Sequence, residues 1–273
     1  MPVHRVHGDE VLGQVTGGDL RKLQTLDPEE VLLHVGVWIP RAAYARWPVM
    51  LPWAVRDLAC RGNKSRGIPD YWSSPDDRGY VLDENSFIKG TVRSLAIDAP
   101  TDSVLSGAKM AGGFVAAHIW REVDQPVLAS KIPLLYSFIP NLVWLPGEVA
   151  KLTDYEGGPY QRTLQAMSAA IYRDAKVEPH LQSVVDEAWA TLPKPDTAPP
   201  DLNADAMNWF IPSEAFYRIR RQRTDQVIAA LETLGAGRPL LRKVISTRYT
   251  AGLPIVDMSA RSELLDWLKR FTS

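Results

Sequence analysis

The sequence has little cysteine, no long apolar run and almost no net charge. Its single cysteine, Cys60, cannot form a disulfide within the chain, and this usage is typical of a reducing cytoplasm. There is no run of 18 apolar residues, and the chain does not start with a basic segment followed by an apolar one. We therefore expect neither a membrane span nor a secretory leader. Paired CxxC motifs are also missing, which excludes a zinc site of four cysteines.

The charges nearly cancel, because 31 Lys and Arg face 32 Asp and Glu, for a formal net charge of −1. A nucleic-acid-binding surface would therefore have to come from local clusters of cations. The chain has 273 residues, of which 45% are hydrophobic. That is enough for one large domain or two modest ones.

Two apolar segments contain the polar residues that are the strongest candidates for catalysis. Residues 112–120 are rich in Phe, Val and Ile and predict a buried strand with His118 near its end. Residues 134–145 form a second apolar run, which is broken at Pro140 and Asn141. A proline there indicates a turn or the edge of a strand.

The spacing becomes helical after the second run. Val149, Leu152 and Tyr155 recur at intervals of three, and Pro146 suits the first turn of a helix. The order is therefore strand, connection, strand and helix. We expect Asp154 to lie two turns into this helix, pointing back toward His118.

This order resembles the His-Me finger (HNH-like) nucleases, in which a ββα-metal unit presents a His, an Asn and a metal ligand. Many members carry an NLxxLP run, and residues 141–146 read NLVWLP. The resemblance implies that His118 is the general base, that Asn141 orients it and that Asp154 binds the metal. Ala117 and Ala150 stand where the family has further ligands. Glu122, or Asp124, is then the second carboxylate.

The implied chemistry is the hydrolysis of a phosphodiester. A neutral imidazole can take a proton from water near neutral pH if a neighbour fixes its tautomer, and either the side chain or the carbonyl of Asn141 could do so. A carboxylate is the ligand that Mg²⁺ or Mn²⁺ prefers, with phosphate oxygens and water completing the shell. One protein carboxylate is enough in principle.

Structural explanations stay open for all three residues. A single His at a strand end is commonly half-buried with its ring nitrogens bonded. Asn141 after Pro140 is ordinary turn chemistry, and Asp154 lies just before Gly157 and Gly158, where a helix can end.

Two basic clusters are candidates for nucleic-acid contact. The first is a Gly- and Ser-containing loop with three cations, followed by two aromatic residues that could stack on bases: Arg61, Lys64, Arg66, Tyr71 and Trp72. The second lies on a helix predicted over residues 213–234 and suits phosphate or groove contacts: Arg218, Arg220, Arg221 and Arg223. A solvated loop and a salt-bridged helix surface are the structural alternatives.

We predict an α+β fold with a central ββα-metal unit in a mixed domain and a mainly helical C-terminal part. Residues 1–100 form an N-terminal α+β region and 101–193 the catalytic region. Four prolines within 193–203 mark 194–203 as an extended linker before the basic region 204–273.

The leading hypothesis is a cytoplasmic, metal-dependent endonuclease acting on double-stranded DNA in restriction or defence, an assignment that rests on analogy. Symmetric cutting of both strands would suit a homodimer, and no membrane partner is expected. The alternatives are a non-catalytic nucleic-acid-binding or scaffold protein with a degenerate finger, and a nuclease toxin.

Overall fold

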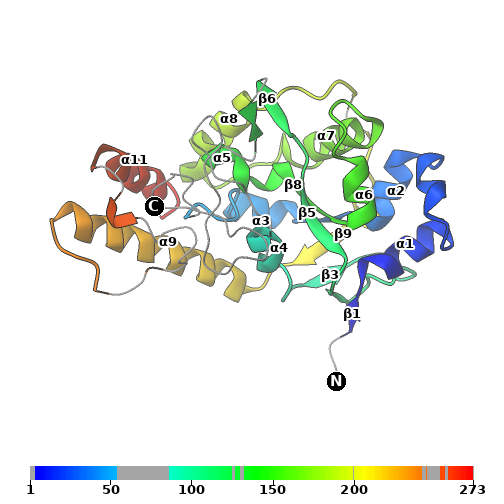
Figure 1. Ribbon diagram of the computed structural model, residues 1–273, viewed down its shortest axis with the longest axis horizontal. Coiled ribbons are helices and arrows are strands. Elements are labelled where there is room, and N and C mark those ends of the chain that lie inside the picture. Colours follow the sequence, from blue (N-terminus) through cyan, green and yellow to red (C-terminus); the bar gives the residue numbers. More distant parts are fainter. Residues whose placement is uncertain are drawn as a thin grey trace.

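The computed structural model describes residues 4–53, 86–124, 127–129, 132–198, 200–241, 244, 253–255 and 258–272. Within these ranges the strands form one mixed sheet of seven strands and a separate two-stranded ribbon. Helices surround the sheet, and the long helix α9 with α11 lies at one end of the molecule (Figure 1). The expected α+β class is therefore confirmed at this level.

The elements have the following bounds. The strands are β1 (Arg5–Val6), β2 (Val37–Trp38), β3 (Ala96–Asp98), β4 (Lys109–Met110), β5 (Phe114–His118), β6 (Glu122–Asp124), β7 (Val127–Leu128), β8 (Leu142–Pro146) and β9 (Asn208–Ile211). The helices are α1 (Gly8–Thr16), α2 (Pro28–Val35), α3 (Arg41–Arg46), α4 (Ser86–Thr91), α5 (Pro133–Tyr136), α6 (Gly147–Leu152), α7 (Pro159–Tyr172), α8 (Gln182–Thr191), α9 (Glu214–Gly235) and α11 (Met258–Lys269). Short 3₁₀ helices are η1 (Leu20–Gln24), η3 (Ile139–Asn141), η4 (Pro179–Leu181), η5 (Ala204–Ala206) and η6 (Leu253–Ile255).

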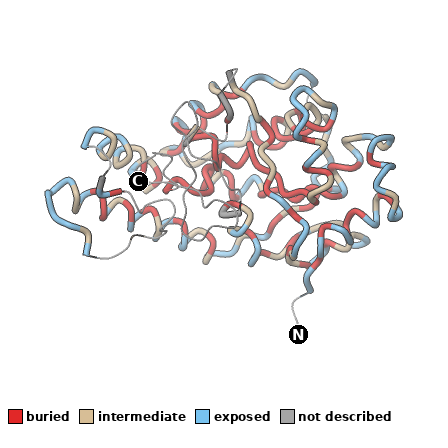
Figure 2. Tube along the Cα trace, in the orientation of Figure 1, coloured by how far each residue is buried: buried red, intermediate tan, exposed pale blue. Residues whose placement is uncertain are grey.

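The strand order in the large sheet is β1-β4-β3-β9-β2-β8-β5. The β1–β4 and β2–β9 pairs are parallel and the other pairs are antiparallel. Strand β8 has all five residues buried, because helices cover it and an apolar run such as LVWLP can face the core on both sides. Figure 2 shows the buried residues running through the middle of the molecule along this sheet.

The Pro-rich segment leads into the middle of this sheet. Strand β9, which follows it, pairs with β2 and with β3. Asn208 in β9 is 1% exposed, and its amide donates to the carbonyls of Leu33, His34 and Gly36 at the end of α2. The N-terminal, central and C-terminal regions therefore share one sheet, which ties them together through backbone hydrogen bonds.

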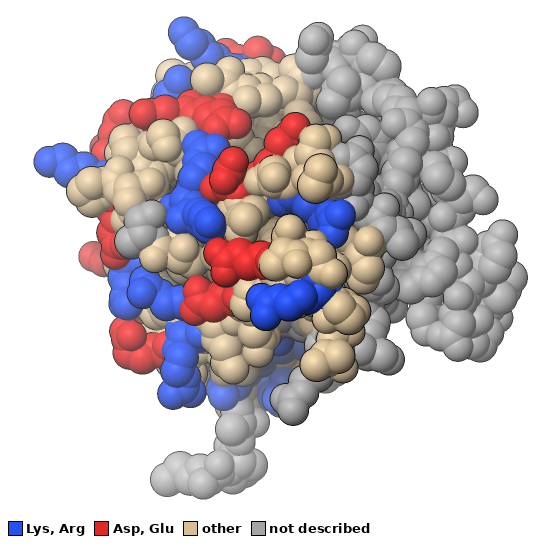
Figure 3. Space-filling model, turned by 90° about the vertical axis from the view of Figure 1, so that its left-hand side faces the viewer, with Lys and Arg blue, Asp and Glu red and all other residues tan. Residues whose placement is uncertain are grey.

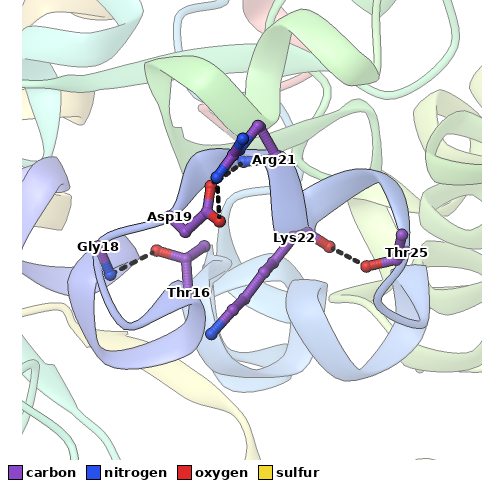
Figure 4. Close-up of polar contacts among 6 residues, drawn as sticks. All are labelled: Thr16, Gly18, Asp19, Arg21, Lys22 and Thr25. Carbon is purple, nitrogen blue, oxygen red and sulfur yellow. Dashed lines mark hydrogen bonds and ion pairs between the residues drawn. The ribbon is translucent and has the colours of Figure 1, made fainter.

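The first helices follow their capping signals. Asp27 precedes α2, and its carboxylate accepts from the Glu29 amide at 2.8 Å, as its position before Pro28 predicts. Asp19 does the same for η1 through the Arg21 amide (Figure 4). The Arg21 side chain also bonds the Asp19 carboxylate and lowers its pKa.

A close backbone approach sets the start of β5. Gly113 has φ +80°, and a Cβ there would lie 3.0 Å from the Gly8 nitrogen. Its carbonyl accepts from the Gly147 amide at 2.8 Å, at the first residue of α6. Glycine is needed here because both the left-handed conformation and the contact exclude a side chain.

No helix within the described ranges is both long enough and apolar enough to cross a membrane.

Candidate functional site

The candidate site lies where β5 ends beside β8. The two strands are antiparallel neighbours, and His118, the last residue of β5, is in register with Leu142, the first residue of β8. Helix α6 follows β8 directly and contacts both strands. The order of strand, connection, strand and helix is as predicted, and the connection contains β6, β7, α5 and η3.

The His118 ring is half-buried and bonded to a backbone carbonyl. Its Nε2 lies 2.9 Å from the Tyr136 carbonyl oxygen, and the two rings stack with centroids 6.0 Å apart. A carbonyl only accepts, so the neutral ring carries its proton on Nε2 and its lone pair on Nδ1. This is the tautomer that a base acting through Nδ1 requires.

Asn141 is fully buried, and its side chain joins two segments of backbone. Its Oδ1 accepts from the Trp120 amide at 2.7 Å, and its Nδ2 donates to the Leu135 carbonyl at 3.2 Å. Its own carbonyl accepts from the Ile119 amide at 3.1 Å. The Ser168 hydroxyl on α7 donates to the Pro140 carbonyl at 2.5 Å and fixes the same turn.

We expected Asn141 to orient the imidazole by direct contact. The Tyr136 carbonyl makes that contact instead. Asn141 instead holds Leu135, the residue before Tyr136, and the backbone just beyond His118. Asn141 therefore bonds the backbone close to both ends of the His118–Tyr136 hydrogen bond.

The prediction that Asp154 lies two turns into a helix is wrong. Helix α6 ends at Leu152, where Thr153 is the C-cap and its hydroxyl donates to the Ala150 carbonyl. A hydroxyl that bonds the preceding turn competes with continuation of the helix, and Tyr155, predicted on its inner face, is 71% exposed. Asp154 consequently occupies the turn after α6.

Arg121 connects this turn to the end of β5. Its Nε is 3.9 Å from an Asp154 carboxylate oxygen, and its Nη1 donates to the Asp154 carbonyl. The Asp154 side chain is 71% exposed. The end of β5 therefore continues into a cation that faces the predicted metal ligand.

Glu122 belongs to β6, which pairs with β7 in the separate ribbon. Asp124 is the last residue of β6. Within the described ranges, no three His, Cys, Asp or Glu side chains group closely enough to hold a metal ion by themselves. Any metal here would rely on few protein ligands.

The arginines of α9 divide into two kinds. Arg218 and Arg221 are exposed, whereas Arg220 is 4% exposed and Arg223 is intermediate. Arg220 does not belong to the exposed basic surface predicted for α9, because its position on the helix turns it into the protein. The face that carries α9 and α11 mixes cations with acidic side chains wherever it is drawn in colour (Figure 3).

The loop candidates Arg61, Lys64, Arg66, Tyr71 and Trp72 lie outside the described residues.

Two functional groups were not found from the sequence. The Tyr136 carbonyl is a backbone atom, so no residue type marks it, and it lies 18 residues from His118. Arg121 follows the strand that carries His118, so the sequence places it near His118. Its pairing with Asp154 depends on where α6 ends, which the sequence pattern did not predict.

No family model, curated protein or solved structure matches this chain.

Proposed function

We propose that this protein is a metal-dependent endonuclease that hydrolyses phosphodiester bonds in double-stranded DNA, with a divergent His-Me finger formed by β5, β8 and α6. The observation that carries the proposal is the His118 ring at the end of β5, with Nε2 bonded to the Tyr136 carbonyl. A general base needs its reactive nitrogen unprotonated and its ring orientation fixed. The bond to the Tyr136 carbonyl fixes the ring and, in the neutral ring, places the proton on Nε2.

In the proposed reaction, His118 takes the proton from the attacking water through Nδ1. Asn141 acts indirectly, because it holds the backbone at both ends of the His118–Tyr136 contact. An imidazole free to rotate would spend less time aligned with the water, and alignment is a large part of catalytic rate. Asn141 is therefore assigned as a positioning residue.

The metal in this proposal is Mg²⁺ or Mn²⁺, with Asp154 as the protein ligand and Glu122 as the additional carboxylate. The Asp154 side chain fits this role because it is mostly exposed and its ion pair with Arg121 is 3.9 Å long. Exposed pairs of this kind contribute about 0–1 kcal/mol, so they exchange readily. Magnesium often uses one or two protein carboxylates and fills its shell with phosphate and water. When bound, the ion would neutralise phosphate charge and stabilise the leaving oxygen.

Arg121 is a further candidate for contact with the substrate. It lies next to Asp154, and a guanidinium released from a carboxylate can bind a phosphate oxygen instead. Arg218 and Arg221 on α9 are exposed and suited to the DNA backbone. Restriction or defence in the cytoplasm, with a homodimer that cuts both strands, remains part of the proposal by analogy.

The test is cleavage of supercoiled plasmid, plain and base-modified, with and without Mg²⁺ or Mn²⁺. We expect metal-dependent nicking or linearisation by the wild type and a loss of roughly 10²- to 10⁴-fold in His118→Ala. His34→Ala is the matched control, since His34 also bonds a backbone carbonyl but lies on the exposed end of α2. Cleavage that survives His118→Ala, or no cleavage under any condition, would reject the proposal.

A non-catalytic nucleic-acid-binding or scaffold protein is the second candidate. The contact between Arg121 and Asp154 favours it, because a cation occupies the place of a metal. This reading predicts metal-independent DNA binding that His118→Ala leaves unchanged. A nuclease toxin would share the chemistry of the first proposal, and discrete fragments would favour restriction over a toxin, which would leave a smear.

A further inference from the structure

A cavity of about 370 Å³ opens at the start of α9, away from the residues of the proposed catalytic site. It is lined by residues from α9, by residues from α4 and the segment after it, and by Trp53. Those that carry the argument are Trp53, Ser94, Ser213, Phe216, Arg220 and Arg223. None of the described residues that line it is acidic.

Arg220 is the buried cation of this cavity. Its guanidinium carbon lies 3.2 Å from the Phe216 ring centroid, and Nη1 donates to the Phe216 carbonyl at 2.9 Å. Nη2 reaches only the Met50 sulfur, at 4.0 Å, and Nε has no hydrogen-bond partner. No carboxylate of a described residue pairs with Arg220, although a buried cation ordinarily has one.

Three further groups strengthen the positive character of the cavity. Arg223 lies one turn beyond Arg220, and its guanidinium is 5.7 Å from the Trp53 ring centroid. Trp53 is 1% exposed, and its Nε1 is also buried without a partner. Ser213 is the N-cap of α9, so the positive end of the helix dipole lies at the same cavity.

This arrangement is costly in the absence of a ligand. Burial, followed by the charge of Arg223, lowers the pKa of Arg220 to about 9, which still leaves the guanidinium charged at neutral pH. Two cations that line one cavity without an acidic residue among its described lining are an arrangement that an anion would satisfy. Functional sites commonly keep a destabilising arrangement of this kind because ligand binding offsets it.

We propose that this cavity binds the phosphate monoester of a nucleotide-sized ligand. The charge of two guanidiniums matches that of a phosphate dianion better than it matches that of a single carboxylate. Arginine also bonds phosphate in a bidentate manner. The volume is within the range of small-molecule sites, roughly 300–1,000 Å³, and exceeds what one inorganic phosphate fills. Ser94 and Ser213 at the mouth are suited to bond the sugar, and Trp53 borders the remaining space. The site is independent of the proposed nuclease activity.

The test measures binding to the full chain by calorimetry and by the rise in Tm at constant ionic strength. The probes are inorganic phosphate, AMP, adenosine and a short oligonucleotide with and without a 5′-phosphate. We expect AMP to bind, inorganic phosphate to bind more weakly and adenosine to have no effect. Arg220→Met and Arg223→Gln should each weaken AMP binding about tenfold or more, the effect of losing one charge-assisted hydrogen bond. Arg238→Gln, an exposed cation just beyond the end of α9, is the matched control and should bind AMP normally.

The probes also distinguish two sources of the phosphate. Tighter binding of AMP than of the 5′-phosphorylated oligonucleotide supports a free nucleotide, and the reverse order supports the end of a nucleic-acid strand. The proposal is overturned if no phosphate-bearing probe binds below about 1 mM, or if Arg238→Gln weakens AMP binding as much as Arg223→Gln. Arg223 is half-exposed, so its variant tests the site even if Arg220→Met fails to fold. Because binding is measured without cleavage, failure here leaves the nuclease proposal untouched.

Discussion

The turn around Asn141 and the cavity beside Arg220 both bury a polar side chain, but they satisfy it differently. Asn141 is 0% exposed, and both ends of its amide bond backbone groups. Arg220 is 4% exposed, has one carbonyl and one sulfur as neighbours, and keeps an unpaired Nε. A buried polar group with all its partners stabilises the fold, whereas a buried cation without an anion is destabilising unless a ligand supplies one.

The comparison also separates two kinds of functional contribution. Asn141 acts through architecture, since it fixes the backbone that orients His118. Arg220 is held in place by the Phe216 ring and carbonyl and is one of the residues that line a cavity.

Asn141→Ala should cause the largest loss of stability. The substitution leaves the Trp120 amide buried without its partner and removes one hydrogen bond from the Leu135 carbonyl, which lowers the free energy of unfolding by about 2–4 kcal/mol. Urea denaturation measures the change. Asn203→Ala is the control, because its side chain accepts one amide hydrogen bond, from Asp205, at an exposed position, and it should cost at most about 1 kcal/mol. Equal losses in the two variants would show that burial of Asn141 does not matter.

Arg220→Met should change stability in the opposite direction. Replacing a buried, unpaired cation by an apolar side chain of similar length removes its desolvation cost, so the ligand-free protein should gain about 1–3 kcal/mol. The same denaturation measurement applies. A loss comparable to that of Asn141→Ala would contradict the contrast drawn here and make Arg220 a structural residue.

Tyr172 provides a third buried polar group, which is satisfied like Asn141 but can ionise. Its hydroxyl donates to the Ile39 carbonyl at 2.5 Å, and burial raises its pKa well above the usual value. The unfolded chain releases this proton near pH 10, whereas the folded chain retains it, so the stabilisation is present below pH 10 and lost as pH rises above it. Tyr172→Phe should cost about 1 kcal/mol at neutral pH and make the loss of stability above pH 10 less steep. An unchanged slope would mean that the hydroxyl is hydrated in the folded protein.

Arg221→Gln should have the smallest effect on stability, within about 0.5 kcal/mol, because the side chain is exposed. If α9 contacts DNA, the same change should reduce the slope of log affinity against log salt by about 1. Fluorescence anisotropy at several salt concentrations measures that slope. Arg220 is the buried neighbour of Arg221, so Arg220→Gln should leave the slope unchanged. A change in the slope for Arg220→Gln would mean that Arg220 contacts the DNA.

Much of the local structure followed from the sequence. The strand with His118 at its end, the break at Pro140 and Asn141 and the start of α2 at Pro28 lie where the residue pattern predicts them. The helix predicted over 213–234 is α9, Glu214–Gly235. These features depend on contacts between residues close in sequence, which composition and spacing record.

The wrong predictions concern contacts across the chain. Spacing put Tyr155 and Asp154 in a helix, but the helix ends at Leu152, and Arg121 holds the Asp154 turn. The pattern of four arginines predicted a basic surface, although Arg220 turns inward. Nothing in the order of residues marks the Tyr136 carbonyl as the partner of His118.

The sequence by itself determined the apolar strands, the capped helices and the set of polar residues available for chemistry, because hydrophobic periodicity and capping act over a few residues. The tertiary structure decided which of those residues are satisfied and which are not. It placed β9 beside β2, enclosed Asn141 between two backbone segments and buried Arg220 with no carboxylate of a described residue beside it. Burial and pairing arise when distant segments pack, so the free energy of a polar group is fixed only once the whole fold is formed.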